Sequence, residues 1–129
     1  MTRVKDYVLE APLIVERVEP SEVTGVYHVE FKSLEESPLL SFEVELPKQV
    51  LPFTRGDKVK VGISSSPIPW GQDADLYLGA KAFGVKQLEE GQKVYASAGG
   101  LQIRLLFKQP QPLKPLDKLY LAIQIIKEE

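Results

Sequence analysis

The stretch Tyr95-Ala-Ser-Ala-Gly99-Gly100-Leu101-Gln-Ile-Arg104-Leu decides the fold class, because two glycines interrupt what is otherwise a strand pattern. Every second residue from 101 to 107 is apolar, the alternation of a strand with one buried face. Glycine inside a strand is unfavourable, so two in succession indicate a bulge, a barrel corner or close approach of another backbone. We therefore expect one long strand over residues 94–108, or two strands bent at the glycines.

The same alternation recurs along the rest of the chain, between turns rich in proline, glycine and charged residues. It predicts further strands over residues 13–19, 26–32, 40–46, 58–64, 76–85 and 119–126. Sustained helical periodicity does not occur. Roughly seven or eight short strands predict an all-β barrel or sandwich. The length is that of a single domain over residues 1–129.

The final strand, residues 119–126, is apolar on nearly both faces. An exposed edge of this kind invites aggregation, so either the sheet closes over it or a partner covers it.

The composition is that of a globular chain, with 43% hydrophobic and 26% charged residues. The sequence has no apolar run near the ~20 residues that span a bilayer, and Met1–Asp6 lacks the apolar stretch of a secretory signal. The absence of cysteine excludes disulfides, thiolate metal sites and a cysteine nucleophile. We expect a cytoplasmic protein without membrane contact.

The net charge bears on the kind of ligand, and the residue usage bears on the kind of source organism. A net charge of −2 argues against a main role in gripping nucleic-acid phosphates, although it leaves room for a local basic patch. The chain contains no asparagine, one methionine and ten prolines, a usage that fits a thermophile.

The sequence offers little catalytic chemistry. His28 is the one histidine, it lies on the polar face of a predicted strand, and no nucleophile-elbow pattern accompanies it. A lone histidine without cysteine does not make the usual zinc site. The acidic pairs Glu35-Glu36 and Glu89-Glu90 flank turns, and the run Gly79–Gly84 is not followed by the helix that a phosphate loop needs. We expect no enzyme, no metal and no cofactor.

Three interpretations of Gly99-Gly100 stay open: a barrel corner, contact with a partner's backbone, and an anion-binding nest. Arg104 lies on the outward face of its strand and is the favoured polar anchor for a partner, because arginine is enriched at interface hot spots. Trp70 lies in a proline-bounded loop, where an interface anchor and a lid over the barrel end are both consistent with the sequence.

The run from Tyr95 to Leu105 resembles the tyrosine, serine, Gly-Gly-Leu and arginine-leucine run of the small β-barrel eighth subunit of archaeal and eukaryotic RNA polymerases. Residues 77–83 and 119–121 resemble that family's preceding and closing strands, and residues 13–31 fit its opening hairpin in pattern only. A short loop at 66–74 and Ala98 in place of an aromatic residue depart from the eukaryotic members. These departures favour an archaeal member.

The resemblance implies a single antiparallel barrel of about eight strands with oligonucleotide-binding-fold character, lodged on the outside of a DNA-dependent RNA polymerase. It implies a non-catalytic auxiliary subunit that docks on the largest subunit and supports assembly, with at most weak or indirect contact with nucleic acid and no small-molecule ligand. On this hypothesis the partner-binding residues are Tyr95, Ser97, Gly99, Gly100, Leu101, Arg104 and Trp70.

Two rival functions follow from the predicted barrel. The first is a free-standing module for single-stranded nucleic acid, which combines exposed aromatic residues with a basic surface. The second is a small-molecule carrier, which needs an interior cavity.

Overall fold

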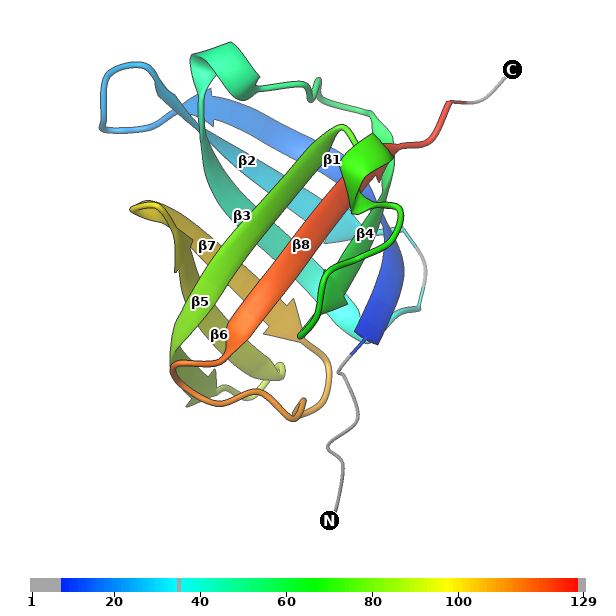
Figure 1. Cartoon of the computed structure of the whole chain (residues 1–129), viewed down its shortest axis with the longest axis vertical. Helices are drawn as coiled ribbons and strands as arrows, with labels where there is room; N and C mark the ends of the chain where they lie inside the picture. The colour runs from blue at the N-terminus through cyan, green and yellow to red at the C-terminus, as the bar shows by residue number, and fades with distance from the viewer. Residues whose placement is uncertain (1–7, 35, 128–129) are drawn as a thin grey trace.

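The computed structural model describes residues 8–34 and 36–127, and within them eight antiparallel strands close into a barrel (Figure 1). The strands are β1 (Val8–Pro20), β2 (Val26–Ser33), β3 (Leu39–Pro47), β4 (Lys58–Ser64), β5 (Leu76–Gln87), β6 (Gln92–Ala98), β7 (Leu101–Phe107) and β8 (Lys118–Ile125). Two short 3-10 turns, η1 (Lys48–Val50) and η2 (Gly71–Asp73), lie in the connections. The described residues do not include Met1–Asp6, the segment judged to lack a secretory signal, nor Glu35 of the acidic pair, nor residues 128–129.

Around the barrel the strands follow the order β1-β2-β3-β7-β6-β5-β8-β4, and β4 pairs back with β1. This confirms the predicted all-β class and selects the barrel over the sandwich. The apolar strand β8 lies between β5 and β4, so closure of the barrel covers both of its edges (Figure 1).

Alternation along the strands builds the core. In β3, Phe42, Val44 and Leu46 are fully buried, whereas the polar residues between them face outward. Phe31 from β2 stacks on Phe42 and meets Phe53 edge to face, both with ring centroids 5.2 Å apart. Side chains therefore fill the interior, which opposes the small-molecule carrier.

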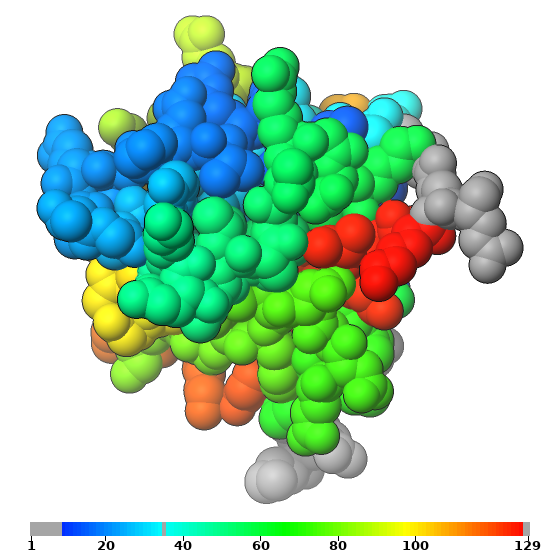
Figure 2. Space-filling view, turned by 90° about the horizontal axis from the view of Figure 1, so that it is seen from above, coloured from blue at the N-terminus to red at the C-terminus, as the bar shows by residue number. Residues whose placement is uncertain are grey.

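Loop residues close the two ends of the barrel. Phe53, which follows η1, is 4% exposed, and the view onto that end shows no opening (Figure 2). The proline-rich crossover between β7 and β8 runs along the opposite end (Figure 1), and Leu113 in this crossover is 6% exposed.

Gly99 and Gly100 form the two-residue turn of the β6–β7 hairpin. The predicted single strand over 94–108 is therefore wrong, whereas the predicted two strands that meet at the glycines are present, joined by a reversing turn and not by a bend. The φ angles of the two glycines, +56° and +89°, are both left-handed, as a type I′ hairpin turn requires. A Cβ atom at either position would meet nothing within 4 Å, so crowding at a barrel corner does not explain them. The nearest bulge lies instead in β5, between Ala82 and Gly84.

This turn geometry predicts opposite results for two substitutions. Gly100→Val should destabilise the fold by at least about 1–2 kcal/mol, because a β-branched residue is strained at positive φ. Gly99→Asn should be nearly neutral, because Asn-Gly is a preferred type I′ pair. Thermal denaturation followed by circular dichroism measures the melting temperature of each variant. If Gly100→Val melted at the same temperature as Gly99→Asn and the unmodified protein, the turn would not need a glycine at position 100.

Candidate functional site

The β6–β7 hairpin brings together every predicted partner-binding residue except Trp70. Tyr95 and Ser97 face outward from β6, and Arg104 faces outward from β7 directly opposite Tyr95. The glycine turn joins the strands at an exposed tip, and Leu101 is half-buried beside it. The hairpin is thus one continuous surface, although its role in binding stays a prediction.

Trp70 lies elsewhere, on the outer face of β4, and is separated from the hairpin by β5 and β8. Its indole covers Gly62, where a Cβ atom would come within 2.6 Å of the ring. The indole Nε1 donates a hydrogen bond of 3.2 Å to Glu10, and Lys60 Nζ lies 4.1 Å from the ring centroid. Trp70 therefore fastens its loop to the barrel wall, and the expected lid over the barrel end is wrong.

Outward-facing charges divide the barrel into two walls. We call the outer surface of β1, β2 and β3 the acidic wall, because it carries Glu10, Glu16, Glu19, Glu30, Glu43 and Glu45. We call the outer surface of β7, β6, β5, β8 and β4 the basic wall, because it carries Lys58, Lys60, Lys81, Lys86, Lys93, Arg104 and Lys118. Within the described chain, strands β4 to β8 contain no Asp or Glu.

Acidic residues also occur in the loops beside the basic wall: Asp73 in η2, Glu89 and Glu90 in the β5–β6 turn, and three aspartates whose carboxylates accept hydrogen bonds. Asp57, Asp75 and Asp117 each accept a hydrogen bond from a backbone N–H group, at 2.9, 2.7 and 2.8 Å. They act as loop-stabilising acceptors. The small net charge of the whole chain therefore conceals a strongly polarised surface.

The walls meet between β3 and β7. Glu43 Oε1 lies 3.0 Å from His28 Nε2 and 4.0 Å from the Arg104 guanidinium, and Glu45 accepts a hydrogen bond from the Gln102 backbone N–H at 3.0 Å. These side chains line a recess of about 20 Å³, the size of a single water molecule. Arg104, the predicted partner anchor, thus already faces a carboxylate of the neighbouring strand.

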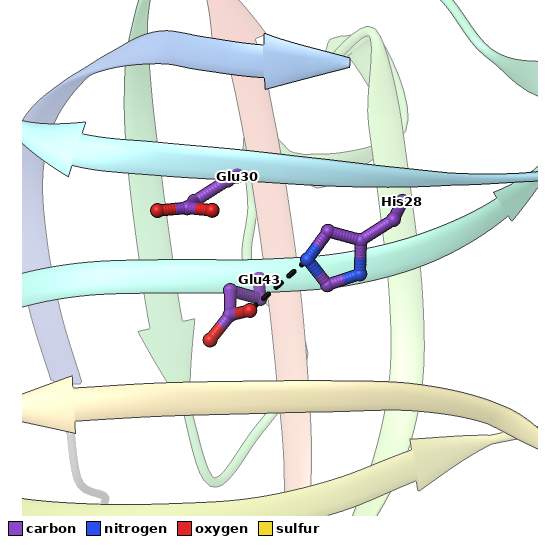
Figure 3. A group of neighbouring side chains, drawn as sticks. All are labelled: His28, Glu30 and Glu43. Carbon is purple, nitrogen blue, oxygen red and sulfur yellow. Dashed lines mark hydrogen bonds and ion pairs between the residues drawn. The ribbon is translucent and has the colours of Figure 1, made fainter. Parts of the chain in front are cut away.

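His28, Glu30 and Glu43 form the one cluster of metal-ligand type found among the described residues, and the sequence did not reveal it (Figure 3). Their ligand atoms lie within 4.8 Å of one another. His28 and Glu30 share a face of β2, and Glu43 stands opposite Glu30 on β3. One imidazole and two carboxylates are a donor set that zinc accepts, although the nearby Arg104 opposes a cation. The register of the β2–β3 hairpin was the signal that would have revealed it.

Two exposed groups have shifted pKa values. A side-chain hydrogen bond to Tyr120 raises the pKa of Lys118, so this lysine stays protonated far above neutral pH. A hydrogen bond of 2.8 Å from Lys108 lowers the pKa of Glu36. Neither shift moves a group toward titration near pH 7, where general acid–base catalysis operates.

The chain matches no model of a known protein family, and it matches no curated protein. No helix in the described part of the chain is long and apolar enough to cross a membrane. The hairpin and the two walls are therefore the features from which function is argued.

Proposed function

We propose that the protein is a non-catalytic auxiliary subunit of a DNA-dependent RNA polymerase, which docks on the largest subunit and supports assembly and stability of the enzyme. The observation that carries the proposal is the closed antiparallel barrel, the fold that the resemblance of residues 95–105 implies. The short loop at 66–74 and Ala98 extend the proposal to an archaeal source, the residue usage to a thermophile, and the lack of cysteine to the cytoplasm.

A role without catalysis agrees with the surroundings of His28. Its Nε2 contacts the Glu43 carboxylate on the outer wall at 3.0 Å. A nucleophile–base pair of the serine-hydrolase kind instead requires a hydroxyl group bonded to that nitrogen.

The β6–β7 hairpin supports docking through its exposed tip. The open space around Gly99 and Gly100 lets another chain approach their backbone closely. Tyr95 and Arg104, side by side on the outward face, are residue types enriched at interface hot spots.

Affinity purification of the tagged full chain from an extract of its source tests the subunit role. We expect the large polymerase subunits to co-purify with it in stoichiometric amounts. Recovery of the protein alone, or with an assembly unrelated to transcription, would contradict the proposal.

A variant pair tests the docking surface. Gly99→Asn combined with Arg104→Ala should reduce recovery of the largest subunit about tenfold. The asparagine side chain fills the open space at the tip, the alanine removes the anchoring guanidinium, and neither change strains the turn. Gly25→Asn is the matched control, since Gly25 also has positive φ and open space but lies in the β1–β2 turn. Equal recovery with both variants would remove the hairpin from the interface and leave the subunit role standing.

A further inference from the structure

Three adjacent strands of the basic wall repeat one short pattern, a lysine followed two residues later by an aromatic residue. The pairs are Lys93 and Tyr95 in β6, Lys81 and Phe83 in β5, and Lys118 and Tyr120 in β8. Residues two apart on a regular strand face the same side, so the pairs of β6 and β8 point outward. Phe83 lies in the β5 bulge, and its 53% exposure and its ring 6.2 Å from that of Tyr95 place it on the same outer surface. β5 pairs with β6 on one edge and with β8 on the other, so the three strands that carry these pairs are neighbours (Figure 1).

The lysines of this wall stand opposite one another. Lys81 is directly opposite Lys118 across the β5–β8 pairing, and Lys86 is directly opposite Lys93 across the β5–β6 pairing. Like charges at opposed positions destabilise a sheet. The described residues contain no ion pair that neutralises any of these four lysines. An anionic ligand lying across β6, β5 and β8 would relieve the repulsion.

Each lysine pair comes with an aromatic surface. Phe83 is 53% exposed, the one aromatic residue among the exposed large hydrophobic side chains of the described residues, and its ring lies 6.2 Å from that of Tyr95. Lys93 Nζ lies 5.7 Å from the Tyr95 ring centroid, and Lys118 Nζ lies 5.1 Å from that of Tyr120. Both ammonium groups lie over their rings, so a flat group that stacks on the same face has to displace the ammonium group, which then stands close enough to meet an attached phosphate.

We infer that the basic wall binds single-stranded nucleic acid across β6, β5 and β8. The lysines contact phosphates, and Phe83, Tyr95 and Tyr120 offer stacking faces to unpaired bases. The aromatic residues decide the class of ligand, because an acidic protein segment would engage the lysines alone and a duplex hides the faces of its bases. Trp70 takes no part, since its ring is packed over Gly62.

This site shares Tyr95 and strand β6 with the proposed docking surface, but the inference does not depend on docking to the polymerase. The acidic residues of the strands lie on the other wall, and Glu89 and Glu90, in the β5–β6 turn, are the acidic residues at the end of the site next to Lys86 and Lys93. Binding by the isolated protein and co-purification with polymerase are separate measurements, so either result can fail without the other.

Fluorescence anisotropy tests the site, with labelled single-stranded DNA and RNA oligonucleotides of one sequence, about 16 nucleotides long. We expect both to bind, with affinity falling as salt rises. Lys81→Gln with Lys118→Gln should lower the slope of log affinity against log salt by about 0.7 for each phosphate that the protein no longer neutralises. Tyr95→Leu should weaken binding roughly tenfold and leave that slope unchanged, because stacking releases no counterions.

The matched control is Lys32→Gln, a lysine in β2 on the acidic wall, where its Nζ contacts Glu16 at 3.1 Å. It should bind as the unmodified protein does. If one of the two oligonucleotides binds more tightly, the result supports the site and shows whether its ligand is DNA or RNA. Three results would each overturn the inference: no salt-dependent binding, unchanged affinity of Tyr95→Leu with polyglutamate competing as well as the oligonucleotide, or a duplex of equal length binding as tightly.

Discussion

Replacing Gly91 with alanine should lower the free energy of unfolding by about 3–5 kcal/mol. Gly91 begins the segment that enters β6, and a Cβ atom there would overlap the carbonyl oxygen of Phe107 in β7. Its φ of +155° is also unfavourable for a residue with a side chain. Because the obstacle is backbone and not the end of a flexible side chain, relief requires the neighbouring strand to shift.

Chemical denaturation monitored by circular dichroism measures this loss. Gly79→Ala in β5 is the matched control, because a Cβ atom at Gly79 meets nothing within 4 Å. Alanine there should leave stability unchanged or raise it by about 0.5 kcal/mol, since glycine in a strand costs conformational entropy. Similar stability of both variants would show that the Gly91 contact is relieved at little cost.

Phe31→Ala should destabilise the barrel by about 3–5 kcal/mol, the cost of emptying a large buried site. Phe31 is fully buried and contacts Phe42 face to face and Phe53 edge to face. The cavity would lie between Phe42 in β3 and Phe53 in the loop after η1, and each of these residues is held in place by its own segment. Incomplete collapse of the site makes the loss large.

The same unfolding experiment with Phe83→Ala supplies the comparison. Phe83 is 53% exposed, so its removal should change stability by less than about 0.5 kcal/mol. If Phe31→Ala were as mild, the interior would be loosely filled, and the case against a small-molecule carrier would fail.

The strands themselves were predictable because alternation is a local property. The prediction over 26–32 agrees with β2 (Val26–Ser33), and that over 58–64 agrees with β4 (Lys58–Ser64). β1 was predicted too short, because it begins at Val8 and not at residue 13. Its first half pairs with β4 and contains Pro12, a residue that is rare inside strands and therefore obscures the alternation. Leu9, Ala11 and Leu13 in this half do alternate into the core, and its pairing with β4 extends the strand beyond the predicted start.

The candidate site was predictable only in part. The residues of the β6–β7 hairpin lie together because they are close in sequence, so their grouping followed from the chain alone. Trp70 was grouped with them wrongly, since its position depends on a contact with Gly62 in another strand. The basic wall was missed because β8 pairs with β5, from which it is far apart in the chain. The cluster of His28, Glu30 and Glu43 was missed because it depends on the register of the β2–β3 hairpin.

The amino-acid sequence by itself determined an all-β chain, the inward and outward face of most strands, and the place of a glycine turn, because the pleat of a strand repeats every two residues. Only the tertiary structure decided that β5 lies between β6 and β8, that their lysines oppose one another, and that acidic and basic strands gather on separate walls. Strand order and register are set by burial of the whole core at once, and they bring together residues that lie far apart in the chain.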